Sequence, residues 1–152
     1  SLRLPHCAEN VLLRDDIQQR MKSAVNETFP ALQLYMDTMG VYVSQPSASR
    51  QDWHQDCSQD SEGNPNMVVF LFAAHHISSQ NGVTEFDGVP SITMQVGDVL
   101  LFSGQEYHRG GANTSNEPRM IAFVTFCSAS FRNCACPLTI PFNCYQPSDI
   151  HM

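Results

Sequence analysis

The sequence lacks any long apolar run, since nothing in it approaches the roughly 18 consecutive apolar residues of a membrane-spanning helix. It is also poor in basic residues: eight Lys and Arg stand against fifteen Asp and Glu, giving a formal charge of -7. No cluster of Lys and Arg is present that would neutralise a run of phosphates. We therefore expect no membrane span and regard nucleic acid as a disfavoured partner, although an acidic chain can still carry a basic groove.

The C-x2-C pairs that mark most structural zinc sites are missing as well. Six cysteines leave three alternatives open: reduced thiols, disulfides formed in an oxidising compartment, or a small zinc site. Asn26-Glu27-Thr28 and Asn113-Thr114-Ser115 match the acceptor pattern for glycosylation, which arises easily by chance. The compartment therefore stays open. The cysteines are Cys7, Cys57, Cys127, Cys134, Cys136 and Cys144.

The N-terminal part of the chain has the periodicity of a helix. Leu13, Ile17, Met21 and Val25 follow one another at intervals of four with polar residues between them, which is typical of an amphipathic helix. We expect this helix over about residues 8–29, ending before Pro30, and supporting whatever fold follows.

The rest of the chain alternates short apolar runs with turn sequences such as Asn81-Gly82 and Val96-Gly97-Asp98. Many short strands behind one helix predict a mainly β sandwich or barrel. With 152 residues and no linker, we expect a single domain with a β core over about residues 31–127 and a Cys- and Pro-rich tail at 128–152. The expected strands are 31–36, 40–45, 66–75, 82–86, 91–96, 98–102 and 119–126.

The segment RQDWHQDCSQD, residues 50–60, places His54 and Asp56 two residues apart. On a β-strand these two side chains would share a face while Gln55 pointed the other way. The pair therefore predicts two ligands of a metal ion, and a third ligand must come from elsewhere in the chain.

His108 is the best candidate for the third ligand. His75 and His76 are adjacent and would face opposite sides of an extended chain, so we interpret them as loop residues. His108 follows a turn and an apolar strand that would return it to the His54 and Asp56 pair. Two imidazoles and one carboxylate with open positions are typical of non-haem Fe(II), whereas zinc usually takes a closed tetrahedral set.

This ordered set resembles the Fe(II)/2-oxoglutarate-dependent dioxygenases with a double-stranded β-helix core, a jelly-roll or cupin-like fold. His54-Gln55-Asp56 is followed by His108 after 51 intervening residues and by Arg119 after ten more. The resemblance runs from about residue 31 to 127. Residues 81–86 are similar to a strand of prolyl 4-hydroxylase-like members, while WHQD and HRGGAN are closer to phytanoyl-CoA hydroxylase-like ones.

The resemblance implies a cofactor set and a reaction. His54, Asp56 and His108 would hold Fe(II), and Arg119 would pair with the far carboxylate of 2-oxoglutarate, which suits a bidentate guanidinium. O2 would be consumed, ascorbate is a possible further reductant, and succinate and carbon dioxide would be the co-products. The reaction would hydroxylate a C–H bond of a protein or peptide side chain or of a small metabolite.

One position departs from that family's pattern. Many members carry Ser or Thr two residues beyond the arginine, and here that residue is Ile121. We expect a hydroxyl from another strand to assist Arg119, with Tyr42 and Thr84 as the main candidates and Tyr35 as a further one.

The neighbours of these residues have ordinary interpretations. We expect Trp53 to pack in the core or at the rim, Cys57 to point off the ligand face, and Arg109 to be solvated or ion-paired. Arg50 lies at the expected mouth of the pocket; an ordinary surface role is the main interpretation, and contact with an acidic group of a substrate is the alternative.

Two other functions remain open. A nucleobase dioxygenase of the methylcytosine-oxidising or repair type is one, although repair enzymes usually carry a second arginine where this chain has Thr125. A jelly-roll binding module without turnover is the other, and the full set of ligand residues argues against it.

Overall fold

The structure is a computed structural model, and it describes residues 14–30 and 32–129. The chain divides into two compact units, Ser1–Gln33 and Leu34–Met152, and each is considered by itself. No helix within the described residues is both long enough and apolar enough to cross a membrane.

The first unit contains helix α2 (Asp15–Thr28). Asp15 and Asp16 lie in its first turn, where carboxylates interact favourably with the helix dipole. The helix ends before Pro30, as expected, and its buried residues are Met21 and Val25. The predicted helix is confirmed over this range, and residues 8–13 lie outside the part of the chain that the structure describes.

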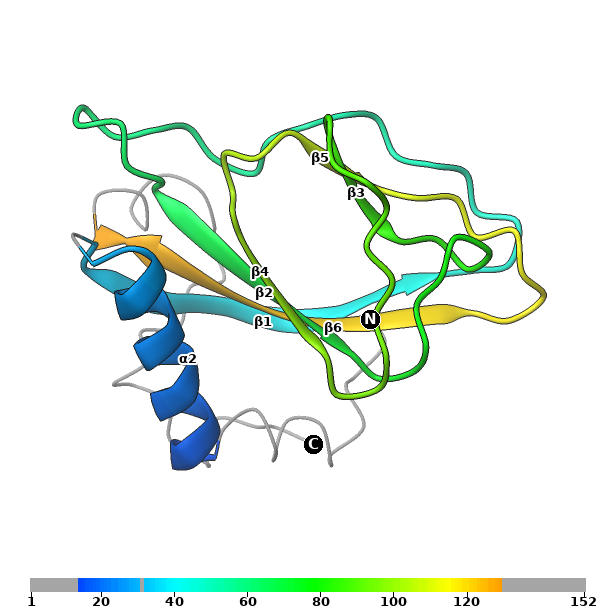
Figure 1. Cartoon of the computed structure of the whole chain (residues 1–152), viewed down its shortest axis with the longest axis horizontal. Helices are drawn as coiled ribbons and strands as arrows, with labels where there is room; N and C mark the ends of the chain where they lie inside the picture. The colour runs from blue at the N-terminus through cyan, green and yellow to red at the C-terminus, as the bar shows by residue number, and fades with distance from the viewer. Residues whose placement is uncertain (1–13, 31, 130–152) are drawn as a thin grey trace, which may run out of the picture. The chain divides into compact units, whose positions relative to one another are not determined.

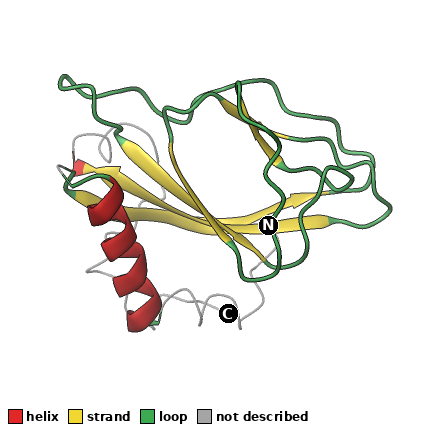
Figure 2. Cartoon of the chain, in the orientation of Figure 1, coloured by secondary structure: helices red, strands yellow, loops and turns green. Residues whose placement is uncertain are grey.

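The second unit is built from two antiparallel sheets (Figures 1 and 2). The larger sheet has the strand order β1-β6-β2-β4, and the smaller one pairs β3 with β5. The mainly β prediction is therefore confirmed. The strands are β1 (Leu34–Ser44), β2 (Met67–Ala73), β3 (Thr84–Phe86), β4 (Val99–Ser103), β5 (His108–Gly110) and β6 (Arg119–Ser128).

The hydrophobic core joins the two sheets. The central strands β2 and β6 are rich in β-branched and aromatic residues and are largely buried, as expected for strands covered on both faces. Phe86 of the small sheet packs edge-on against Phe102 of the large sheet, with ring centroids 5.1 Å apart. The buried core cluster is completed by Val69, Leu71, Ala73, Ile77, Val83, Met94 and Ile121.

Several strand boundaries differ from those expected. The runs 31–36 and 40–45 form one strand, β1, whose register shifts between Met36 and Thr38, while residue 31 is not described. Gly40 does not interrupt this strand, because it makes room for a ring: a Cβ there would lie 2.8 Å from Phe123 Cε1.

Other differences lie around the small sheet and at the chain end. The strand expected at 91–96 is wrong, because only Met94 forms an isolated bridge, to Ile77. Conversely, His108 belongs to a short strand, β5, where we expected a connecting segment. Strand β6 continues to Ser128, and residues 130–152 of the expected tail lie outside the described residues.

Candidate active site

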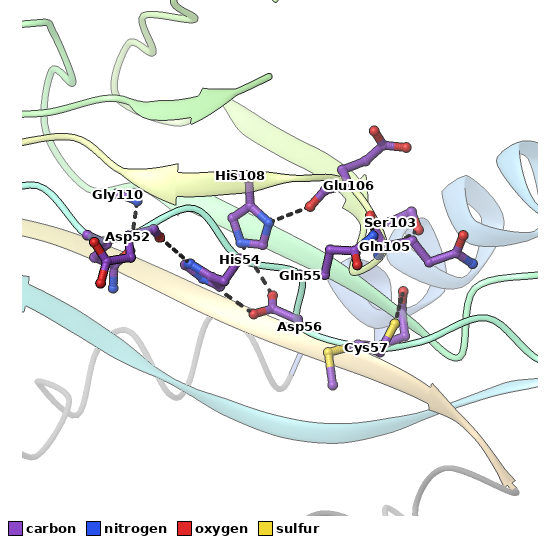
Figure 3. A network of polar contacts seen from close by, with 12 residues as sticks. Asp52, His54, Gln55, Asp56, Cys57, Ser103, Gln105, Glu106, His108 and Gly110 are labelled. Carbon is purple, nitrogen blue, oxygen red and sulfur yellow. Dashed lines mark hydrogen bonds and ion pairs between the residues drawn. The ribbon is translucent and has the colours of Figure 1, made fainter. Parts of the chain in front are cut away.

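His54 and His108 are neighbours across a single β-bridge (Figure 3). The amide of His54 donates to the carbonyl of His108 at 3.0 Å, and the amide of His108 donates back at 2.9 Å. His108 belongs to β5, but residues 53–56 form no regular strand, so the expected strand alternation is wrong for His54 and Asp56. The bridge, rather than a strand, brings the two imidazoles together.

The three predicted ligands converge on one point. His54 Nε2 lies 3.8 Å from Asp56 Oδ1, and His108 Nε2 lies 3.5 Å from Asp56 Oδ2. One ligand atom from each of the three residues lies within 4.8 Å of the other two. Two ligands that each sit about 2.1 Å from a shared ion are at most about 4.2 Å apart. The two His to Asp separations are therefore compatible with one shared metal ion.

The backbone fixes the direction of both imidazoles. His54 Nδ1 lies 2.8 Å from the carbonyl oxygen of Asp52, and His108 Nδ1 lies 2.8 Å from that of Glu106. A carbonyl only accepts, so we assign the ring proton to Nδ1, which leaves a lone pair on each Nε2. Those lone pairs face the Asp56 carboxylate, which also only accepts, so a cation would complete the set.

Asp56 is held by the chain that follows β4. Its amide donates to the carbonyl of Gly104 at 2.7 Å, and the amide of Cys57 donates to the same oxygen at 3.2 Å. The Cys57 thiol is buried and lies 4.0 Å from the Met67 carbonyl oxygen, outside the ligand cluster. Burial raises the pKa of this thiol, so it stays protonated near neutral pH.

These ligands line a pocket of about 430 Å³ together with Arg119, Tyr42 and Thr84. The size lies in the range of small-molecule sites. Part of the wall is apolar and comes from the large sheet through Val69, Leu71, Phe102 and Ile121. The pocket therefore combines an apolar wall with a few polar groups that can orient a ligand.

Arg119 is the buried cation of this pocket. It is the first residue of β6 and is only 8% exposed. Nη1 donates to the carbonyl oxygen of Gly82 and lies 3.4 Å from that of Gly111, whereas the buried Nε finds no partner in the described part of the chain. No carboxylate among the described residues forms an ion pair with it. Burial lowers the pKa of Arg119, but arginine keeps its charge in proteins, so this buried charge favours the binding of an anion.

Thr84 and Tyr42 offer hydroxyl groups to the same pocket. Thr84 is buried, and its hydroxyl makes no hydrogen bond within the described part of the chain. Tyr42 is 54% exposed and stacks on Phe123 with 4.3 Å between the ring centroids; partial desolvation, followed by the Asp56 charge, raises its pKa, so the phenol remains a donor. Tyr35, the third hydroxyl considered, does not line the pocket.

The cradle of Arg119 was missed by sequence reasoning. Gly82 has φ +92°, and a Cβ there would lie 2.6 Å from Arg119 Nη1 and 2.5 Å from the Gly111 oxygen. Only glycine fits such a position. The sequence shows that Asn81-Gly82 favours a turn, but it does not show that Arg119 packs against this turn.

Asn113, the first residue of the glycosylation-type sequence Asn113-Thr114-Ser115, has a structural role. Its side chain is fully buried, and its amide donates to the carbonyls of Ser44 and Glu117 while its oxygen accepts from Ser115. These bonds tie the end of β1 to the connection that leads into Arg119. The Asn113 amide is therefore engaged in the folded protein.

The other neighbours of the motif are paired. Arg50 and Arg109 both contact Glu85, at 3.1 Å and 2.7 Å. The expectation of an ion-paired Arg109 is thus confirmed, and Arg50 also has an internal partner. Trp53 is half-buried and lies under the Arg109 guanidinium.

Comparison with known proteins gives structural but not sequence relatives. No protein-family model matches the sequence, and no curated protein is similar to it. The solved structure of AviO1 from Streptomyces viridochromogenes Tue57 is similar, with a TM-score of 0.63 and 15% identity, covering 87% of this chain and 62% of that one.

Two further solved structures have names that describe their chemistry. The non-heme alpha ketoglutarate dependent epimerase SnoN from nogalamycin biosynthesis has a TM-score of 0.56 and 17% identity, over 76% of this chain and 57% of its own. CytC3 with Fe(II) and alpha-ketoglutarate has a TM-score of 0.53 and 15% identity, over 77% and 54%. The chain thus spans little more than half the length of these proteins. The likeness confirms the predicted double-stranded β-helix fold.

Proposed function

We propose that this chain is the core of an oxygenase that depends on Fe(II) and 2-oxoglutarate and hydroxylates a C–H bond. One observation carries the proposal: a cluster of two imidazoles and one carboxylate lines the same pocket as a buried arginine that has no carboxylate partner within residues 14–30 and 32–129. A metal and a dicarboxylate would satisfy both features at once. The names of the structural neighbours SnoN and CytC3 support the use of iron and 2-oxoglutarate, and hydroxylation is the finer part of the proposal.

The residues present fit the cofactors. His54 and His108 would bind Fe(II) through Nε2, because each Nδ1 is engaged by a carbonyl, and Asp56 would supply the negative ligand. When bound, Fe(II) with 2-oxoglutarate and O2 supplies the oxidant for hydroxylation, with succinate and carbon dioxide as co-products. Ascorbate would serve as an auxiliary reductant.

The protein side chains orient the cosubstrate. Arg119 would receive the far carboxylate of 2-oxoglutarate through Nε, which has no partner among the described residues, and through the adjacent Nη2, while Nη1 stays on its carbonyls. Thr84 would donate its hydroxyl to the same carboxylate, in the role that a Ser or Thr would have at the position of Ile121. Tyr42, whose phenol is protonated at neutral pH, would donate to a ligand oxygen near Asp56. The apolar wall would exclude water from the rest of the ligand.

The prime substrate would be a side chain of a protein or peptide or a small metabolite. A nucleobase substrate is less favoured, because the chain carries a net charge of -7. In addition, the Thr125 hydroxyl is bonded to the backbone of Thr38 rather than directed to a ligand.

Release of succinate from 2-oxoglutarate, measured with Fe(II), ascorbate and O2, tests the reaction. We expect slow succinate formation without prime substrate, and its loss in His108→Ala. The matched control is His76→Ala, which removes an exposed imidazole outside the ligand cluster. A protein that binds Fe(II) and 2-oxoglutarate but never forms succinate, with any substrate tried, would instead be a binding module.

A further inference from the structure

The residues adjacent to the two histidines contact each other. Trp53 precedes His54, and Arg109 follows His108 on β5, where successive side chains point to opposite faces. The Arg109 guanidinium carbon lies 4.1 Å from the centroid of the Trp53 ring. The segments that carry the two imidazoles are therefore joined a second time, through side chains outside the ligand cluster.

Glu85 anchors this contact to the small sheet. It is the cross-strand partner of Arg109 in the β3–β5 pair, and Arg109 Nε donates to Glu85 Oε2 at 2.7 Å. The two side chains are only 20% and 19% exposed, so this pair is less screened than an ordinary surface ion pair. Arg50 binds the other carboxylate oxygen at 3.1 Å. Glu85 thus holds Arg109 in place above Trp53.

The backbone alone gives His54 little support. Its segment joins β5 through one isolated bridge and through Gln51, whose amide donates to the Gly110 carbonyl and whose side chain accepts from the Gly110 amide. Isolated pairings of this length are marginal in water. Metal ligands, by contrast, must be held within a few tenths of an ångström of a productive geometry.

We propose that Trp53, Arg109 and Glu85 form an outer clasp that positions His54 relative to His108 for a shared metal ion. The clasp touches neither metal nor cosubstrate, so its residues are positioning residues. The inference rests on the proposed function in taking the three-residue cluster as a metal site. It adds that metal affinity depends on a guanidinium stacked on an indole outside that site.

Titration with Co(II) tests the clasp without turnover, because the visible absorption of this ion reports its coordination. We expect Arg109→Gln and Trp53→Leu each to weaken Co(II) binding by about 3- to 10-fold, less than the about 10- to 100-fold typical of a residue bonded directly to a ligand. The double variant should lose about as much as the weaker-binding single variant, since the two side chains make one contact. Arg14→Gln, which breaks an exposed Arg to Asp pair in α2, is the matched control and should leave binding unchanged.

Two further measurements separate positioning from simple stabilisation. Trp53→Phe keeps an aromatic face for the guanidinium and should restore most of the affinity lost in Trp53→Leu. The melting temperature should be measured with and without the same excess of Co(II), because the stabilisation by a ligand grows with the logarithm of its affinity. Weaker binding in the clasp variants would make the rise in melting temperature on adding Co(II) smaller than in the wild type.

The results distinguish the clasp from the metal site itself. If Arg109→Gln and Trp53→Leu bind Co(II) as tightly as the wild type, the clasp is overturned and the metal site stands. The same holds if Trp53→Phe is no better than Trp53→Leu. If the wild type gives no Co(II) spectrum that depends on His54, the metal site is wrong, and the clasp falls with it.

Discussion

The two ends of the pocket, at the His54, Asp56 and His108 cluster and at Arg119, are built in different ways. The side chains of His54 and Asp56 are 39% and 32% exposed and come from irregular chain, where His54 is held by a two-bond bridge to His108 and the Asp56 amide by one bond to Gly104. Arg119 is 8% exposed, begins a long central strand and is cradled by two carbonyls. The metal ligands are thus positioned by short backbone contacts, with the proposed clasp as a further support, whereas the Arg119 guanidinium is positioned by a central strand and two backbone carbonyls. We therefore expect the two ends to fail separately.

Asp56→Asn should have the largest effect, because it removes the charged ligand with little change of shape. We expect iron affinity to fall by more than the about 100-fold upper range for losing an outer partner of a ligand, and turnover to disappear with it. Asp52→Asn is the control: its carboxylate is exposed, and the carbonyl that orients His54 is kept. Fe(II) binding by equilibrium dialysis measures both. Equal losses in the two variants would show that local charge, not ligation, matters.

Arg119→Gln should separate the two ends. The substitution removes charge-assisted hydrogen bonds worth about 1.5–3 kcal/mol each, so 2-oxoglutarate should bind at least about 100-fold more weakly. Iron affinity should stay within about twofold of the wild type, since no metal ligand is touched. Titrations of Fe(II) and then of 2-oxoglutarate give both constants. A large loss of iron affinity here would contradict the independence of the two ends.

Gly82→Ala tests the cradle. We expect about 1–3 kcal/mol lower stability from the positive φ, together with weaker 2-oxoglutarate binding because a Cβ would displace Arg119. Gly63→Ala is the matched control, because Gly63 also has positive φ (+84°) but nothing lies within 4 Å of the added Cβ. Urea unfolding and cosubstrate titration report the two effects. If both variants bind 2-oxoglutarate equally well, the carbonyl cradle does not position the guanidinium.

Thr84→Val should give the smallest effect. Loss of one neutral hydrogen bond, about 0.5–1.5 kcal/mol, predicts about 2- to 10-fold weaker 2-oxoglutarate binding with unchanged iron affinity. Thr84→Ser keeps the hydroxyl and should bind almost as tightly as the wild type. If Thr84→Val binds normally and Tyr42→Phe does not, the assisting hydroxyl belongs to Tyr42.

The sequence predicted which residues would meet, but not how they are held. The order of the apolar strands predicted that His108 would return to His54 and Asp56, and the resemblance to the dioxygenase family added Arg119. The structure places all four at one pocket. We expected His54 and Asp56 to share a face because alternate side chains of a strand do so, but residues 53–56 form no regular strand. The bridge between the histidines and the carbonyls that orient their rings depend on backbone paths, which side-chain identity encodes only weakly.

The bounds of a strand could be predicted where a continuous apolar segment of the sequence forms one buried strand. The runs of β2, β4 and β6 were found almost as they are, because buried strands are continuous apolar segments. The sequence SITMQV at 91–96 alternates like a strand, yet among these residues only Met94 forms a bridge, to Ile77. β5 went unnoticed because three residues, His108, Arg109 and Gly110, carry no apolar pattern.

The most direct test of the account is anaerobic absorbance of the protein with Fe(II), before and after addition of 2-oxoglutarate. The account predicts a new metal-to-ligand charge-transfer band that is absent in His54→Ala and needs much more 2-oxoglutarate in Arg119→Gln. The proposal is contradicted if iron binds at the cluster and no charge-transfer band forms at any concentration of 2-oxoglutarate. In that case Arg119 would serve a different anion, and the proposed cosubstrate would be wrong.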